Sequence, residues 1–131
     1  MGSDFKHVFT PAEIRGVRYK NRLEMAPTSP KFTDPNGFMT TEHIEYFRPI
    51  AKGGVGAITL GNCSIDIAHF QDEPRQVALD NDHYIPGLTR FVDMVEQYGV
   101  VGQCEINHAG LDSNWGLNHF PGLGPTRQLM P

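Results

Sequence analysis

The chain has 131 residues, 39% of them hydrophobic and 20% charged, and its 11 basic and 15 acidic side chains give a net charge of −4. This length fits one domain of ordinary size, and the charge excludes a nucleic-acid binder and a protein that docks on acidic membranes, because both need a basic surface. Cys63 and Cys104 are too few for a disulfide framework or a paired zinc motif, so we predict buried free thiols in a reducing cytoplasm. No apolar run is long enough to predict a membrane span.

Three apolar segments are predicted as β-strands, at residues 22–27, 55–60 and 100–106. In the first strand, Leu23 and Met25 lie on one face, so Glu24 between them points to the opposite face. The second segment is almost continuously apolar, which is typical of a strand covered on both faces. Residues 15–17 precede these strands and are predicted as the tip of a small hairpin.

Two helices are predicted between the strands. Thr40 or Thr41 can cap the first, which ends at a pair of glycines, and Pro49 is expected to kink it or end it early. The second ends at Gly99. The apolar residues that recur at helical spacing are Ile44, Phe47 and Ala51 in the first helix, and Ile85, Leu88, Val92 and Val95 in the second.

The order strand–helix–strand–helix–strand predicts a parallel sheet. In such folds the loops after the carboxyl ends of the strands carry the chemistry. These loops are expected at residues 28–39, with a turn at 34–37, and at residues 62–82 and 107–131. Residues 54–56 (Gly-Val-Gly) precede a strand instead of following one, so they are interpreted as a helix stop and not as a dinucleotide motif.

The second loop is rich in side chains that can bind metals, but they follow no metal-site spacing. We predict a solvated loop and no metal for His69, Asp72, Glu73, Asp80, Asp82 and His83. The three strand ends, residues 25–29, 60–62 and 105–110, place small residues beside hydroxyl, amide and carboxylate groups. That combination suits a flat polar heterocycle, and it equally suits ordinary packing at the rim of a barrel.

Four segments resemble the Old Yellow Enzyme family of FMN-dependent NADH:flavin oxidoreductases and ene-reductases, in its 2,4-dienoyl-CoA reductase and 2-enoate reductase branch. They are Lys20–Pro27, Ala51–Ile58, Asn107–Gly110 and Gly124–Thr126, in family order and at family-like spacing. The resemblance implies an α/β fold, the N-terminal three βα units of a (β/α)8 TIM barrel, incomplete in this chain. It also implies one partial domain over residues 1–131.

Within that domain the resemblance implies a hairpin or lid over residues 1–21, the β–α–β–α–β core over 22–110 and a loop over 111–131. It further implies that FMN is bound by Ala26, Pro27, Thr28, Ser29, Asn62 and Glu105. Ser29 stands where the family often has Thr or Cys near flavin O4 and N5. Glu105 replaces a frequent Gln, and a carboxylate accepts from flavin N3–H but cannot donate to a carbonyl. Leu111 replaces a frequent Arg.

The activity implied by the resemblance is transfer of a hydride from NADH or NADPH through FMN to an activated C=C bond of a small enone or enoyl substrate. The family's substrate-anion His/Asn pair, its Tyr proton donor and its phosphate-binding loops lie on later strands, so no catalytic residue is assigned and the chain is expected to be inactive alone. One alternative is a non-catalytic half-barrel that serves as an interaction or structural module, by self-association or with a missing barrel half. A further alternative is a flavin-free site that uses Glu105 and His108 as acid and base.

Overall fold

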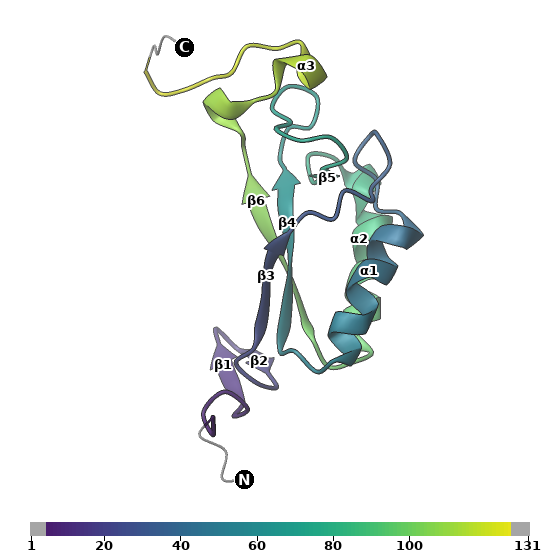
Figure 1. The fold of residues 1–131 in the computed structure, drawn as a ribbon, viewed down its shortest axis with the longest axis vertical. Coiled ribbons are helices and arrows are strands. Elements are labelled where there is room, and N and C mark those ends of the chain that lie inside the picture. Colours follow the sequence, from purple (N-terminus) through teal and green to yellow (C-terminus); the bar gives the residue numbers. More distant parts are fainter. Residues whose placement is uncertain (1–4, 127–131) are drawn as a thin grey trace.

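The computed structural model describes residues 5–126, which fold as an open α/β unit (Figure 1). The strands are β1 (Ala12–Ile14), β2 (Val17–Tyr19), β3 (Glu24–Thr28), β4 (Ala57–Ser64), β5 (Val77–Ala78) and β6 (Val101–Asn107). The helices are α1 (Thr41–Lys52), α2 (Ile85–Glu96) and the single-turn α3 (Trp115–Asn118), with 3₁₀ turns at Asp82–Tyr84 and Gly110–Asp112. No helix in the described range is long and apolar enough to cross a membrane.

The main sheet is parallel, as the order of elements predicts. β4 lies in the middle, with β3 on one side and β6 on the other, and short β5 pairs with the last two residues of β4. β1 and β2 form a separate antiparallel hairpin at the amino-terminal end of the sheet (Figure 1). Its tip falls at Arg15 and Gly16, both with positive φ, which confirms the predicted hairpin.

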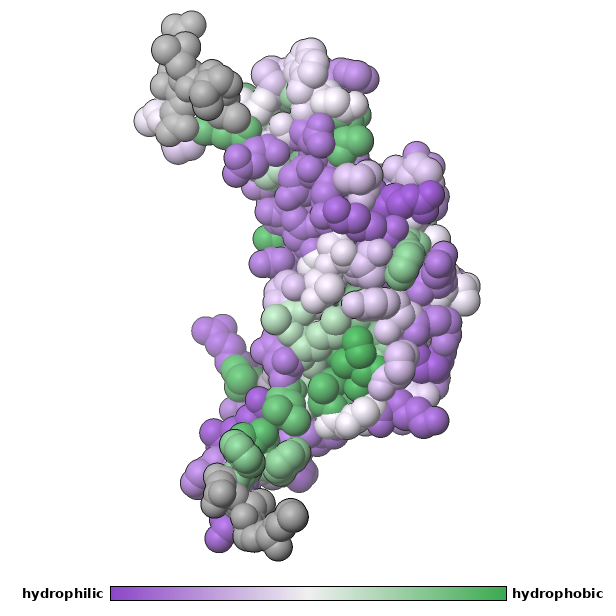
Figure 2. Space-filling view, viewed as in Figure 1, coloured by the Kyte–Doolittle hydropathy of each residue, from purple (hydrophilic) through white to green (hydrophobic). Residues whose placement is uncertain are grey.

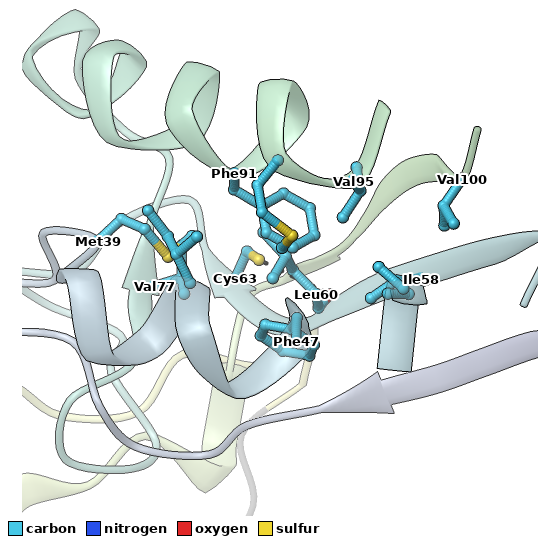
Figure 3. Packing of buried hydrophobic residues seen from close by; sticks show 12 residues of the cluster. Met39, Phe47, Ile58, Leu60, Cys63, Val77, Phe91, Val95 and Val100 are labelled. Atoms are coloured by element: carbon cyan, nitrogen blue, oxygen red, sulfur yellow. Dashed lines mark hydrogen bonds between the residues drawn. The ribbon is translucent and has the colours of Figure 1, made fainter. Parts of the chain in front are cut away.

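Both long helices cover the same face of the sheet (Figure 1). Phe47 of α1 and Phe91 of α2 meet edge to face, with ring centroids 5.5 Å apart, over Ile58 and Leu60 of β4 (Figure 3). All four side chains are almost fully buried. This layer between helices and sheet is the hydrophobic core, and its packing holds β4 in place against the two helices.

Helix α1 follows its predicted cap and apolar stripe, but it does not end early. Thr40 Oγ1 accepts from the backbone N–H of His43 at 3.1 Å. The helix continues through Pro49 to Lys52, and Gly53 N–H donates to the Pro49 carbonyl at 2.9 Å. Pro49 is exposed, so the Glu45 carbonyl that loses its backbone partner faces water, and the helix tolerates the proline.

The buried stripe of α2 differs from the predicted one. Of the four predicted residues, Val95 is buried and Leu88 packs against the core, whereas Ile85 and Val92 are exposed; Phe91 and Met94 are buried and were not predicted. The buried side of α2 includes Phe91, whose ring packs edge to face on Phe47 of α1.

Strand β4 is longer than predicted and runs through Ser64, so Asn62 lies within the strand instead of starting a loop. The pairing of β4 with β6 is irregular between Leu60 and Cys63 and then resumes, with Cys63 opposite Ile106. The prediction that both thiols are buried is right for Cys63 and wrong for Cys104. Cys104 is exposed because β6 is an edge strand of the described sheet.

The face of the sheet away from the helices carries a row of polar side chains. Thr59 Oγ1 donates to Glu24 Oε1 at 2.6 Å and lies 3.4 Å from Gln103 Oε1, and Gln103 Nε2 donates to the Tyr19 hydroxyl at 3.3 Å. Met25 packs against the core, so Glu24 points to this opposite face, as the alternation predicts. In Figure 2, hydrophobic side chains gather low on the molecule, near the hairpin, and hydrophilic ones dominate above them.

Asn21 joins the segment before β3 to the turn before β4. Its Nδ2 donates to the Gly54 carbonyl at 2.7 Å, and its Oδ1 accepts from Leu23 N–H at 3.0 Å. A Cβ on Gly56 would clash with the backbone carbonyl of Asn21 and would lie 2.7 Å from its Oδ1, so Asn21 occupies the space that any larger residue at 56 needs.

Candidate functional site

The carboxyl ends of β3, β4 and β6 lie side by side at one edge of the sheet. Thr28 is the register partner of Leu60, and Leu60 is in turn the partner of Cys104. The strands approach closely at Gly61, where an added Cβ would lie 2.8 Å from Pro27 Cα. The parallel pairing therefore brings together the three segments that the sequence places at one site.

The end of β3 offers a small, largely apolar surface with one free hydroxyl. Ala26 and Pro27 are exposed, and Thr28 and Ser29 are half-buried. Thr28 Oγ1 donates to the Ala26 carbonyl at 3.1 Å, so this hydroxyl hydrogen is already engaged. No described residue is hydrogen-bonded to the Ser29 hydroxyl, which leaves Ser29 as the available donor at this strand end.

Glu105 lies on β6 beside the irregular stretch of β4. It follows Gln103 at the two-residue period of a strand, which places both side chains on the polar face of the sheet. Glu105 is exposed and forms neither a hydrogen bond nor an ion pair with any residue between 5 and 126. Its carboxylate is thus an uncommitted acceptor at the edge where the strands end.

Unlike Ser29 and Glu105, Asn62 is hydrogen-bonded within the chain. Its Nδ2 donates to Asp72 Oδ2 at 2.9 Å, and the same oxygen lies 3.4 Å from the Nδ2 of Asn107. Asn62 Oδ1 is buried and receives no hydrogen bond from the described chain. The prediction of a solvated loop at Asp72 is therefore wrong, because this carboxylate is half-buried and bonded to both strand ends.

His108 follows β6 and stacks on Phe70, with ring centroids 4.1 Å apart. Its Nδ1 accepts from Gly110 N–H at 3.1 Å, so a neutral imidazole carries its proton on Nε2. An acid–base pair of His108 and Glu105 needs a ring nitrogen that is free to accept a proton. In this tautomer that nitrogen is Nδ1, which already accepts the hydrogen bond from Gly110 N–H, so the structure does not favour the pair.

The loops after β4 and β6 are tied to each other. Asn114 N–H and Asn118 Nδ2 donate to the Gln71 carbonyl at 2.9 and 2.8 Å, and Ser113 Oγ donates to the His69 carbonyl at 3.0 Å. Helix α3 takes part in these contacts through Asn118. The sequence predicts only a loop after Asn107, so α3 was not predicted. Its only sequence signal is Asn114, whose side chain caps Gly116 N–H at 3.0 Å.

Two cations in the loops after β3 and β4 have partners within the chain. Lys31 lies 3.2 Å from Glu73, and Arg75 donates to the Thr33 carbonyl at 2.9 Å.

Burial raises the pKa of the Cys63 thiol to about 12, so Cys63 stays protonated and is no nucleophile at neutral pH. Within residues 5–126 no cluster of three His, Cys, Asp or Glu side chains could hold a metal ion.

The strand ends offer groups of the kind that the ring of a flavin would need. Ala26 and Pro27 provide a flat contact, Ser29 can donate to a ring carbonyl, and Glu105 can accept from the ring N3–H. The phosphate is not matched in the same way, because the nearby Lys31 and Arg75 are already bound within the chain. The groups at the strand ends could therefore hold the ring, whereas these two cations are engaged and are not free for the phosphate.

Comparison with known proteins agrees with this geometry. Residues 7–127 match the model of the NADH:flavin oxidoreductase / NADH oxidase family. A metal reductase of Desulforamulus reducens is 34% identical over 119 residues, which cover 91% of this chain and 17% of that protein. An NADH oxidase of Thermoanaerobacter brockii is 30% identical over 121 residues, covering 92% and 18%. The chain thus spans about a sixth of the length of these relatives.

Solved structures share the fold. A 2-naphthoyl-CoA reductase in complex with 2-naphthoyl-CoA superposes with a TM-score of 0.80 at 27% identity, covering 86% of this chain and 17% of that one. Old Yellow Enzyme from Pichia sp. AKU4542 superposes with a TM-score of 0.81 at 16% identity, covering 92% and 32%. The strands of residues 5–126 form the parallel βα units of the N-terminal part of such a barrel and do not close it. The chain is therefore a member of the NADH:flavin oxidoreductase / NADH oxidase family, the family of Old Yellow Enzyme.

Proposed function

We propose that this chain forms the ring-binding part of the FMN site in an NAD(P)H-dependent ene-reductase. The observation that carries the proposal is the alignment of three strand ends: Pro27 and Ser29 lie at the end of β3 and Glu105 lies on β6, on the two sides of β4. Bound FMN supplies hydride transfer from NADH or NADPH to the β-carbon of an activated alkene. The residues of this chain hold and orient the ring, and the reacting His/Asn pair and Tyr belong to later strands.

The names of the relatives indicate the substrate class. Those that match include an NADH:fumarate oxidoreductase of Klebsiella pneumoniae and an NADH:acrylate oxidoreductase of Vibrio harveyi, at 34% and 31% identity over 95 and 99 residues. Fumarate and acrylate are alkenes conjugated to a carboxylate. We propose unsaturated acids, enones or their thioesters as substrates of the complete enzyme, in a cytoplasmic setting that keeps both cysteines reduced.

A second candidate is a non-catalytic half-barrel that acts through association. The exposed edge of β6 favours it, because Ile106 is 68% exposed and Cys104 beside it is exposed too. An unpaired strand edge with apolar side chains is a template for pairing with another chain, either a second copy or the rest of a barrel.

Flavin absorbance separates the two candidates. The purified chain is mixed with FMN, and the spectrum of the protein fraction is recorded after gel filtration, with the particle mass measured in the same run. Stoichiometric flavin in the fraction supports the ring-binding role. Flavin-free protein that elutes as a dimer or larger assembly supports the association role and contradicts the flavin proposal for this chain.

FMN and riboflavin provide a sharper form of this test. If residues 5–126 hold the ring and not the phosphate, the chain binds both with dissociation constants within about threefold of each other, a difference below about 1 kcal/mol. FMN binding more than tenfold tighter than riboflavin contradicts the assignment of the phosphate to other strands. Fluorescence quenching of each flavin measures the two constants.

A further inference from the structure

One carboxylate joins the ends of two strands at the candidate site. Asp72 lies in the loop after β4, and its Oδ2 is 2.9 Å from Asn62 Nδ2 on β4 and 3.4 Å from Asn107 Nδ2 at the end of β6. Asn62 and Asn107 come from strands that are directly paired, so the loop reaches back over both of them. We call these three residues the Asp72 clamp.

The chemistry of the three groups fixes how the two amides are turned. A side-chain amide has a donor end and an acceptor end, whereas a carboxylate only accepts. Both Nδ2 groups must therefore face Asp72. Asn62 Oδ1 is then directed into a buried position with no described donor, so the amide of Asn62 is committed to the clamp and not offered to a ligand.

The clamp adds little to the stability of the fold. Asp72 Oδ1 is buried and receives no hydrogen bond within the described chain, as is also true of Asn62 Oδ1. An unpaired buried acceptor costs about as much free energy as a made hydrogen bond contributes. The gain from two bonds is therefore offset by the two unpaired acceptors, and a purely stabilising role does not account for the arrangement.

We propose that Asp72 is a positioning residue for the flavin site. It holds the ends of β4 and β6 at a fixed spacing. Because Pro27 packs on Gly61 of β4 and Glu105 belongs to β6, that spacing also sets the distance between Pro27 and the Glu105 carboxylate. This inference rests on the proposed function, and it assigns to Asn62 a part in the clamp instead of a direct contact with the ring through its amide.

Glu73 provides a matched control. It is the next residue of the same loop, it is half-buried, and it also carries a buried oxygen without a described partner. Its ion pair, however, goes to Lys31 in the loop after β3 and not to the strand ends. Glu73→Gln therefore loosens the same loop and leaves the clamp intact.

The experiment compares Asp72→Ala, Asp72→Asn and Glu73→Gln in the 131-residue chain. The first readout needs no flavin and consists of the side-chain amide signals of Asn62 and Asn107 in spectra of the nitrogen-15-labelled protein. The second is the dissociation constant of FMN from fluorescence quenching. The third is the unfolding midpoint in urea.

We expect Asp72→Ala to move both amide signals to solvent-exposed positions and to weaken FMN binding about tenfold, with little change in the unfolding midpoint. Asp72→Asn keeps an acceptor oxygen, so it retains the amide signals and binds FMN within about threefold of the parent. Glu73→Gln is expected to change neither the two amide signals nor FMN binding.

Parent amide signals that already look solvent-exposed overturn the inference, and so does equal FMN binding by the parent, Asp72→Ala and Glu73→Gln. Loss of FMN binding in Glu73→Gln as large as in Asp72→Ala does so as well, because it indicates general loosening of the loop. A parent chain that binds no FMN contradicts the proposed function instead, and the amide signals then decide whether the clamp exists.

Discussion

The two faces of the parallel sheet are built from different chemistry. The face under α1 and α2 is dry and apolar, with Phe47, Phe91, Ile58 and Leu60 almost fully buried (Figure 3). The opposite face carries Glu24, Thr59, Gln103 and Glu105, and the described chain puts no helix over it (Figure 1). The difference teaches that the covered face forms the hydrophobic core, whereas the open face carries polar groups, of which Glu105 alone among these four has no hydrogen-bond partner in residues 5–126.

The largest effect is expected from a cavity in the covered face. Phe47→Ala removes a ring that contacts both α2 and β4, and it should lower the free energy of unfolding by about 3–5 kcal/mol. Urea titration followed by far-UV circular dichroism measures it. Gln103→Ala on the open face is the paired variant and should cost less than about 1 kcal/mol. Equal losses in the two variants would contradict the division between the faces.

The second effect concerns a titratable group under the covered face. His43 is 1% exposed, neither ring nitrogen has a hydrogen-bond partner in the described chain, and burial lowers its pKa from 6.5 to about 4. Between pH 6.5 and 4 the unfolded chain takes up a proton at His43 and the folded chain does not, so acid favours unfolding. This one group should remove about 3 kcal/mol of stability over that range.

His43→Phe tests this prediction, because phenylalanine keeps an aromatic ring beside Phe47 and cannot be protonated. Urea unfolding of both proteins between pH 7 and 4 gives two stability curves, and their difference isolates His43 from the carboxylates. The parent should lose stability more steeply than the variant. Parallel curves would show that His43 is not held neutral by burial.

The third effect belongs to the open face and is seen in binding, not in folding. Glu105 has no partner in the described chain, so Glu105→Ala should leave the unfolding free energy within about 0.5 kcal/mol of the parent. It should weaken FMN binding about tenfold, as expected for the loss of one hydrogen bond that a carboxylate makes. Fluorescence quenching and urea titration measure the two quantities. A stability loss without a binding loss would place Glu105 in the fold instead of the site.

The smallest effect is expected at the hydrogen bond between Thr59 and Glu24. Thr59→Val keeps the shape of the buried side chain and removes its 2.6 Å bond to the exposed carboxylate of Glu24. The free energy of unfolding should fall by about 0.5–1.5 kcal/mol. Urea titration is again the measurement, and a loss as large as that of Phe47→Ala would mean that the open face contributes to the core.

Regular elements could be predicted wherever a local rule decides. The alternation around Met25 predicts Glu24 on the open face, and the sequence predicts a threonine cap at 40 or 41, of which the structure shows Thr40. The buried side of α2 could not be predicted in the same way, because Phe91 and Val92 both fit a helical stripe, and contact with Phe47 on another element decides between them.

The candidate site shows the same limit. The strand-end segments could be found from composition and family resemblance, and parallel pairing brings them together. The role of Asp72 could not, since it depends on a loop that returns to Asn62 and Asn107 across gaps of 10 and 35 residues. No periodicity or motif in the sequence reports such a contact, and an isolated aspartate in a polar loop looks the same whether or not it is bonded.

The contact between Asn21 and the turn before β4 bears on how this sequence can vary. Position 56 admits only a hydrogen atom as its side chain, because Asn21 fills the adjacent space. Position 54 has no atom within 4 Å of an added Cβ and is restricted only by its backbone φ of +98°. In a saturation library, substitutions at 54 should survive in part, with asparagine foremost, whereas those at 56 should vanish whatever residue stands at 21, because the backbone carbonyl of residue 21 occupies the space. The two glycines of this short turn thus serve different purposes: Gly56 avoids a clash with Asn21, and Gly54 adopts a positive φ that other residues rarely reach.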